Sequence, residues 1–175
     1  MNLFKKLFGK SNLPDKSNEN KSLDIDKLTN STDKNGSIIE LDNYICKFCE
    51  YGDRLDKLTE PQKNFYYNQN LEREVNNGGF NQFYLNPSGD FAHETVNSLK
   101  EIGAHKTAEI LQKANDQFPD KTVPKDREKR QETLEQIEDA ANKIWEELDQ
   151  KFFTYEDDLN SLNMDYVSKN RNDFK

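Results

Sequence analysis

Residues 59–79 read TEPQKNFYYNQNLEREVNNGG, and this stretch predicts a helix with a defined start and a defined end. Thr59 offers a hydroxyl N-cap, Pro61 stands in the first turn, and Gln62 follows the cap by three residues. The helix is expected to run to about Val75, because the two asparagines and two glycines that follow tolerate positive φ.

Helical spacing of apolar residues continues on both sides of this stretch, and alternating runs typical of strands are hard to find. Upstream of this stretch, the expected buried positions are Leu41, Ile45 and Phe48, in a helix ending near Gly52. Within it, they are Tyr67, Leu71 and Val75. After the turn at residues 86–89, they are Ala92, Val96, Leu99 and Ile102, then Ala104, Ala108, Leu111 and Phe118. A long helix from about Asp126 to Asp149 carries Leu134, Ile137, Ala141, Ile144 or Trp145, and Leu148; a last one carries Leu159, Leu162 and Tyr166.

The N-terminal part of the chain has a composition that disfavours a packed core. Between Lys10 and Asn35 it is rich in Ser, Asn, Lys and Asp, and its scattered Leu and Ile residues follow no sustained period. Such a segment buries too little apolar surface to offset its ordering entropy. We therefore predict a flexible leader and linker over residues 1–36 and one helical domain over residues 37–175.

The first ten residues, MNLFKKLFGK, combine Leu and Phe with lysines. This pattern is typical of a frayed leader or of a short amphipathic helix that touches a membrane surface. Lys5 and Lys6 interrupt the apolar run, so the segment lacks the continuous stretch of a secretory signal. No part of the sequence approaches the roughly 18 apolar residues of a membrane span. The sequence therefore predicts a soluble, cytoplasmic protein without stable membrane insertion.

The sequence shows no motif typical of a metal site or a redox site. Cys46 and Cys49 stand in CKFC, but a structural zinc site needs a second ligand pair, and a redox pair needs a strand-helix-strand context. His93 and His105, the only histidines, fall on different expected helices. We expect two semi-buried helical thiols in a reducing compartment, with no cofactor and no metal.

The segment from Glu74 to Asn86 crowds amides, glycines and aromatic residues into one junction between expected helices. One interpretation is a small polar site, in which the amides bind a ligand and the glycines allow close backbone approach. The other is that the amides bind unpaired backbone groups at two helix ends while the aromatic rings fill the core. The residues of this junction motif are Glu74, Asn76, Asn77, Gly78, Gly79, Phe80, Gln82, Phe83 and Asn86.

Acidic residues gather in the last third of the chain. Between Leu134 and Asp165, ten acids stand against two lysines, a net charge of −8 that equals the formal charge of the whole chain. Such an excess repels nucleic acid and favours basic partners, although it is also typical of a solvated helix face. The predicted acidic face comprises Glu135, Glu138, Asp139, Glu146, Glu147, Asp149, Glu156, Asp157 and Asp158.

Catalysis is not indicated by any motif. Glu72, Glu74 and Glu94 could supply paired carboxylates, but the sequence does not determine the distance or orientation between any two of them. The sequence His93-Glu94 does not begin a zinc-protease motif, because Asn97 stands where the second histidine is required. We therefore expect a protein that is not an enzyme and has no catalytic residues.

With these features in place, residues 58–118 resemble a bacterial family of domains of unknown function whose best-studied type is a DNA-mimic protein. The NNGGF-x-QF core at residues 76–83 carries the resemblance, with support from Glu74, Asn86, Leu99, Ile102, Gly103, Ala104, Ala108, Ile110 and Leu111. The resemblance implies an all-helical fold. For the DNA-mimic member it also implies a dimer whose surface carboxylates imitate duplex phosphates and occupy a transcription factor. Fold alone does not establish mimicry, because mimicry depends on where the surface acids lie.

The sequence thus predicts an all-α, compact bundle of about six helices behind a flexible extension. The favoured function is that of an interaction protein, of DNA-mimic type, whose acidic face binds a basic, nucleic-acid-binding protein without binding nucleic acid itself. The alternative is a small-ligand or peptide-binding module centred on the junction motif.

Overall fold

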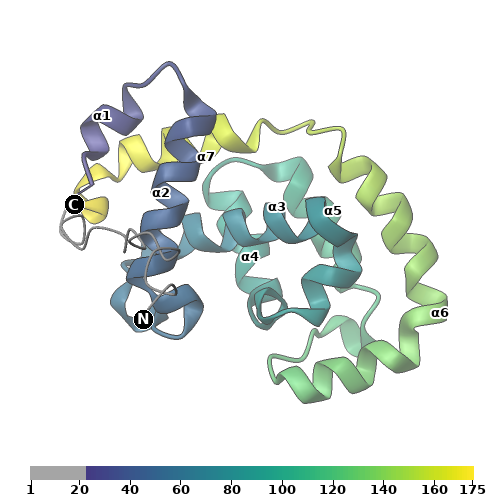
Figure 1. Cartoon of the computed structure of the whole chain (residues 1–175). Coiled ribbons are helices and arrows are strands. Elements are labelled where there is room, and N and C mark those ends of the chain that lie inside the picture. The colour runs from purple at the N-terminus through teal and green to yellow at the C-terminus, as the bar shows by residue number, and fades with distance from the viewer. Residues whose placement is uncertain (1–22) are drawn as a thin grey trace, which may run out of the picture.

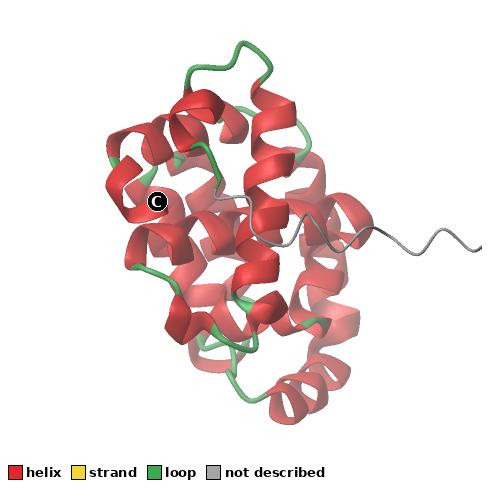
Figure 2. Ribbon diagram, turned by 60° about the vertical axis from the view of Figure 1, so that its left-hand side comes forward, coloured by secondary structure: helices red, strands yellow, loops and turns green. Residues whose placement is uncertain are grey.

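The computed structural model describes residues 23–175, and this range contains helices and turns but no strand (Figure 2). The prediction of an all-α fold is therefore confirmed. The expectations for residues 1–22, including the MNLFKKLFGK segment, lie outside the described residues. The α-helices are α1 (Ile25–Thr29), α2 (Lys34–Phe48), α3 (Glu60–Leu85), α4 (Ala92–Glu101), α5 (His105–Asn115), α6 (Arg127–Phe152) and α7 (Leu159–Lys169).

Short 3-10 turns connect these helices. They are η2 (Glu50–Gly52), η3 (Leu55–Lys57), η4 (Pro87–Phe91), η5 (Pro119–Lys121) and η6 (Arg171–Phe174). Among the helices of residues 23–175, none has both the length and the apolar composition that crossing a bilayer requires.

Helix α3 lies at the centre of the molecule (Figure 1). Its start is the expected capping box: Oγ1 of Thr59 accepts from the N–H of Gln62 at 3.3 Å, and Oε1 of Gln62 accepts from the N–H of Thr59 at 3.0 Å. The helical backbone is interrupted at Gly78 and Gly79, a few residues after the predicted end near Val75. Because helical geometry resumes after the glycines, α3 is one kinked element rather than two separate helices.

Two clusters of buried side chains pack against α3. The larger cluster joins its second half to α4, α5 and α6, and the smaller joins its first half to α1, α2, α7 and η6. Helix α7 contacts both, since Leu159 belongs to the larger cluster and Met164 to the smaller. In Figure 1, α1, α2 and α7 lie on one side of α3, and α6 follows the right and lower edges of the molecule.

Residues 24–36 differ from the flexible linker expected there. Asp24 caps α1, whose Ile25 and Leu28 are buried in the smaller cluster, and Asp33 caps α2. Two apolar residues in a polar segment show no period, yet they are enough to anchor one helical turn onto a surface built by distant parts of the chain. The composition of the segment could not reveal that surface.

One side chain at a helix end differs from the expected pattern, and one alternative is resolved. Phe48, expected inside, is 42% exposed, because α2 ends there and Cys49, which is fully buried, takes the interior position. Of the two alternatives in the long helix, Trp145 is buried and Ile144 is exposed. The remaining apolar positions of α2 that were expected in the core, Leu41 and Ile45, are completely buried.

Candidate functional site

The junction motif forms the kink of α3. Gly79 has a φ of +70° and a ψ of −171°, a combination that is essentially restricted to glycine. The backbone N–H of the next residue, Phe80, donates to Oδ1 of Asp149 on α6 at 2.9 Å. A Cβ atom at Gly79 would overlap Oδ2 of the same carboxylate. Asp149 therefore acts as an N-cap, supplied by another helix, for the second half of α3.

The polar side chains of the motif pair with groups around the kink. Oε2 of Glu74 accepts from Nε2 of Gln82 and from Nδ2 of Asn86, each at 2.7 Å. Nδ2 of Asn76 donates to the phenolic oxygen of Tyr155 at 2.6 Å. Asn77 is exposed and forms no side-chain hydrogen bond with the residues that the structure describes. The amides of Asn76, Gln82 and Asn86 therefore bind side chains rather than the unpaired backbone groups that the architectural interpretation expected.

The aromatic residues of the motif lie in the larger cluster. Phe80, Phe83 and the adjacent Tyr84 have no exposed surface. The ring of Tyr84 lies 5.2 Å from that of Trp145, and its hydroxyl donates to Oδ1 of Asn115 at 2.7 Å. Burial raises the pKa of Tyr84 well above its usual value, so the phenol stays neutral and remains a donor. These rings anchor the kink to α5 and α6.

A buried arginine, which the sequence analysis did not single out, holds the chain that follows the motif. Arg130 on α6 has no exposed surface. Its Nε donates to the carbonyl oxygen of Tyr84 at 2.7 Å, and its Nη2 donates to the carbonyl of Asn86 at 3.1 Å and to Oδ1 of Asp90 at 2.5 Å. A Cβ atom at Gly89 would lie 2.8 Å from Nε of this arginine, so η4 needs a glycine to approach it.

Three members of the predicted acidic face accept hydrogen bonds from backbone amides, although Asp158 is also exposed. Asp149 caps the second half of α3, and burial raises the pKa of its carboxyl group. Oδ2 of Asp157 accepts from the N–H of Thr107 in the first turn of α5 at 2.8 Å. Asp158 caps α7, and the hydrogen bond from the N–H of Ser161 lowers the pKa of Asp158. These carboxylates contribute to the fold through helix capping.

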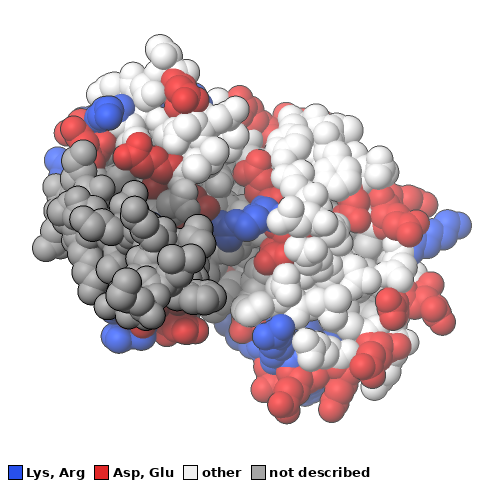
Figure 3. All heavy atoms as spheres, in the orientation of Figure 1, with Lys and Arg blue, Asp and Glu red and all other residues white. Residues whose placement is uncertain are grey.

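The other six members of the predicted acidic face are exposed. None of them forms an ion pair with any residue that the structure describes. They are Glu135, Glu138, Asp139, Glu146, Glu147 and Glu156. Figure 3 shows acidic side chains along the right and lower edges of the molecule, where α6 lies, with a few basic side chains among them. Glu128 and Glu132 extend this row toward the start of α6.

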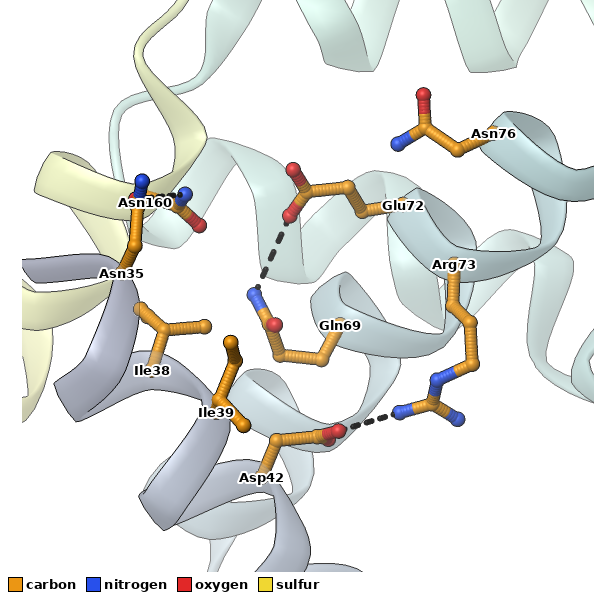
Figure 4. Close-up of a pocket in the computed structure, with 9 residues that line it drawn as sticks. All are labelled: Asn35, Ile38, Ile39, Asp42, Gln69, Glu72, Arg73, Asn76 and Asn160. Atoms are coloured by element: carbon orange, nitrogen blue, oxygen red, sulfur yellow. Dashed lines mark hydrogen bonds and ion pairs between the residues drawn. The ribbon is translucent and has the colours of Figure 1, made fainter.

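A pocket of about 320 Å³ lies between α2, α3 and α7 (Figure 4). Within it, Nη2 of Arg73 binds Oδ2 of Asp42 at 2.6 Å, and Nε2 of Gln69 donates to Oε2 of Glu72 at 3.4 Å. Burial raises the pKa of Glu72. Asn76 is the junction-motif residue that lines this pocket. Much of its polar lining is thus already paired internally.

Both cysteines are free and buried, more deeply than the semi-buried helical thiols that were expected, and Cys49 lies just after the end of α2. Burial, followed by the nearby Asp42, raises the pKa of Cys46 to about 11 and disfavours its thiolate. Nε2 of His93 accepts from the N–H of Val123 at 3.1 Å, and Glu94 pairs with Lys125. Within residues 23–175, no group of three or more His, Cys, Asp or Glu residues is arranged to hold a metal ion.

The sequence of the chain matches the model of a protein family. The family model described as "DMP19-like protein" matches residues 56–170, which include all of α3 to α7. No curated protein and no solved structure matches the chain. The match covers both the junction motif and the row of exposed acids on α6.

Proposed function

Because this chain belongs to the DMP19-like protein family, whose best-studied type is a DNA mimic, we propose that it binds a basic, DNA-binding protein through the exposed carboxylates of α6. The partner is a protein rather than a nucleic acid, since the same carboxylates repel a phosphate backbone. A dimer, which the family resemblance implies for the DNA-mimic member, stays a prediction.

The density of carboxylates along α6 carries this proposal. The exposed acids between residues 128 and 147 are Glu128, Glu132, Glu135, Glu138, Asp139, Glu146 and Glu147. Twenty residues of α-helix span about 30 Å, so these seven acids supply about one carboxylate per 4 Å. The exposed Lys129 and Lys143 reduce the net charge of the exposed side chains from −7 to −5 (−7 + 2), about one per 6 Å. A single DNA strand presents about one phosphate per 3.4 Å along the duplex axis. A basic surface that binds a DNA strand would therefore meet carboxylates at a similar spacing on α6, with a lower net charge density.

These carboxylates form no ion pair with the described residues, and this also supports the proposal. A carboxylate that already binds a lysine or arginine must lose that partner, or share it, before it binds another protein. The exposed acids of α6 have no such partner among residues 23–175. Their charge is therefore available to accelerate association with a basic protein.

Neutralising part of this row is expected to weaken the interaction. The variant combines Glu138→Gln, Asp139→Asn, Glu146→Gln and Glu147→Gln. At about 0.2–1 kcal/mol for each of four exposed pairs, or about 0.8–4 kcal/mol in all, the affinity for the partner should fall about 4- to 800-fold. The wild-type chain is used to capture proteins from nuclease-treated lysate at low salt, and a captured protein is purified. Its binding to both chains is then measured at two salt concentrations.

The matched control removes the same amount of charge from other exposed positions. It combines Glu40→Gln, Glu101→Gln, Glu109→Gln and Asp165→Asn, none of which lies on α6. We expect the control to bind nearly as well as the wild type, and we expect duplex DNA to compete with the wild type for the partner. Undiminished binding by the α6 variant, or equal losses in both variants, would rule out the acidic row as the binding surface.

The alternative function, ligand binding at the junction motif, can be separated from an architectural role by two substitutions. Gln82→Ala leaves Glu74 with one fewer donor and is expected to lower the free energy of unfolding by about 1.5–3 kcal/mol, the usual range for hydrogen bonds to charged groups. Asn77→Ala removes an exposed amide and should change it by less than about 0.5 kcal/mol. Urea unfolding measures both. A Gln82→Ala chain of unchanged stability would favour the ligand-binding interpretation.

A further inference from the structure

A smaller pocket lies where the turns η2 and η4 meet the first half of α3. Its volume is about 170 Å³, below the roughly 300–1,000 Å³ of sites for drug-sized ligands, so it suits a single head group. Four aromatic side chains and two carboxylates form much of its wall, which we call the tyrosine pocket: Tyr51, Tyr66, Tyr67, Phe91, Asp53 and Asp90.

The charge of the tyrosine pocket is negative. None of the residues that line it is Lys, Arg or His. Asp53 forms no ion pair with any residue that the structure describes. Oδ1 of Asp90 accepts a hydrogen bond from Nη2 of Arg130 on α6. The lining therefore offers a carboxylate that lacks a partner and no cation of its own.

The rings of the pocket are packed against one another. Tyr67 stacks on Phe91 with ring centroids 5.0 Å apart, and Tyr66 meets Tyr67 edge to face at 6.2 Å. Tyr51 is 73% exposed. The face of an aromatic ring carries partial negative charge, and several rings around one cavity form the arrangement that recognises ammonium groups in other proteins.

The backbone next to the pocket is strained. Glu50, Tyr51 and Gly52 have consecutive positive φ values of 53°, 58° and 107°. Such conformations are uncommon for residues other than glycine and cluster at functional sites. A Cβ atom at Gly52 would lie 2.7 Å from the hydroxyl oxygen of Tyr66, so the turn approaches α3 closely. Oγ of Ser88, in the same lining, is buried and has no hydrogen-bond partner among the described residues.

We propose that the tyrosine pocket binds an alkylammonium group, with the aromatic rings as a cage and Asp53 as the counter-charge. The group can belong to a methylated lysine side chain of another protein, or to a small free quaternary ammonium compound such as choline. The chemistry that the pocket recognises is the same in both cases: a positive charge spread over a compact, partly apolar head group. This site is separate from the acidic row of α6.

A charged ligand and its neutral isostere test the proposal on the full chain. Choline is titrated into the protein and followed by NMR, and 3,3-dimethylbutan-1-ol, in which carbon replaces the ammonium nitrogen, is titrated in parallel. Choline is expected to shift resonances of the pocket residues and to bind about 10-fold more tightly than the neutral alcohol. Equal affinities, or no shifts with choline at tens of millimolar, would overturn the proposal.

Two exposed positions allow the pocket to be altered without disturbing the core. Tyr51→Ala and Asp53→Asn are each expected to weaken choline binding about 3- to 10-fold. The controls are Phe153→Ala and Asp165→Asn, an exposed ring and an exposed carboxylate that do not line the pocket. Circular dichroism checks that all four variants fold. Unchanged choline affinity in both pocket variants would assign the shifts to another site and contradict the proposal.

The source of the ammonium group is distinguished by a second ligand. N-acetyl-trimethyllysine methylamide carries the same head group as choline on a peptide backbone. If it binds more tightly than choline and loses affinity in Tyr51→Ala, the pocket recognises a protein side chain. If choline binds more tightly and shows the same loss, the pocket recognises a small free quaternary ammonium compound. Both outcomes support an ammonium site.

Discussion

Replacing Arg130 with methionine is expected to lower the free energy of unfolding by about 3–5 kcal/mol, because each buried acceptor left without its donor costs about 1–3 kcal/mol. The substitution removes the donors that bind the carbonyl oxygens of Tyr84 and Asn86, and it leaves Asp90 without its cation. Methionine fills much of the volume but offers no donor. Urea unfolding followed by circular dichroism measures the loss.

Two further variants identify the cause of that loss. Arg127→Met, at an exposed position one turn earlier in α6, should change the free energy of unfolding by less than about 0.5 kcal/mol. Arg130→Lys keeps the charge but not the planar fork, so its stability should fall between those of the wild type and Arg130→Met. If Arg130→Met unfolds within about 1 kcal/mol of the wild type, the arginine does not hold η4 in the way the geometry indicates.

Gly79→Ala is expected to lower the free energy of unfolding by about 3–5 kcal/mol. About 1–3 kcal/mol comes from forcing a side chain into a backbone conformation that is essentially restricted to glycine. A further part comes from the Cβ atom, which displaces Asp149 and breaks its hydrogen bond with the N–H of Phe80, a charged-acceptor bond of about 1.5–3 kcal/mol. The same unfolding experiment measures the change.

Another glycine with positive φ provides the control. Gly103 has a φ of +86°, and the nearest atom to an added Cβ would be Cδ2 of Leu162 at 4.0 Å. Gly103→Ala should therefore cost only the conformational part, about 1 kcal/mol. Equal losses in Gly79→Ala and Gly103→Ala would mean that the close approach of Asp149 adds nothing to the requirement for glycine.

The local signals in the sequence were sufficient to predict six of the seven α-helices of residues 23–175. The cap at Thr59 and the glycine pair at Gly78 and Gly79 have direct structural counterparts, because a capping box and a positive φ depend on residues that are close in sequence. The all-α class followed from apolar periodicity. Helix α1 was missed because its stability comes from packing onto distant helices, which local composition does not encode.

The partners of the candidate site could not be predicted in the same way. The contact between Asp149 and Phe80 joins residues 69 positions apart, so an aspartate in an acidic run gave no sign of capping a helix. The buried arginine left a weak signal: Arg130 stands four residues before Leu134, on the side of α6 expected to face the core. A charged residue at an apolar position indicates a buried polar contact, but it does not identify the partner.

Helix α3 belongs to both apolar clusters, with Phe65 in the smaller and Phe83 in the larger. Loss of either cluster would therefore strip one half of the same helix of its packing and leave it exposed to water. In proteins most of the stability of an α-helix comes from the tertiary packing of its apolar face, so α3 would have little stability without these contacts. The two halves of the molecule are thus thermodynamically coupled, and a destabilising change beside the kink weakens the distant smaller cluster as well as its own surroundings.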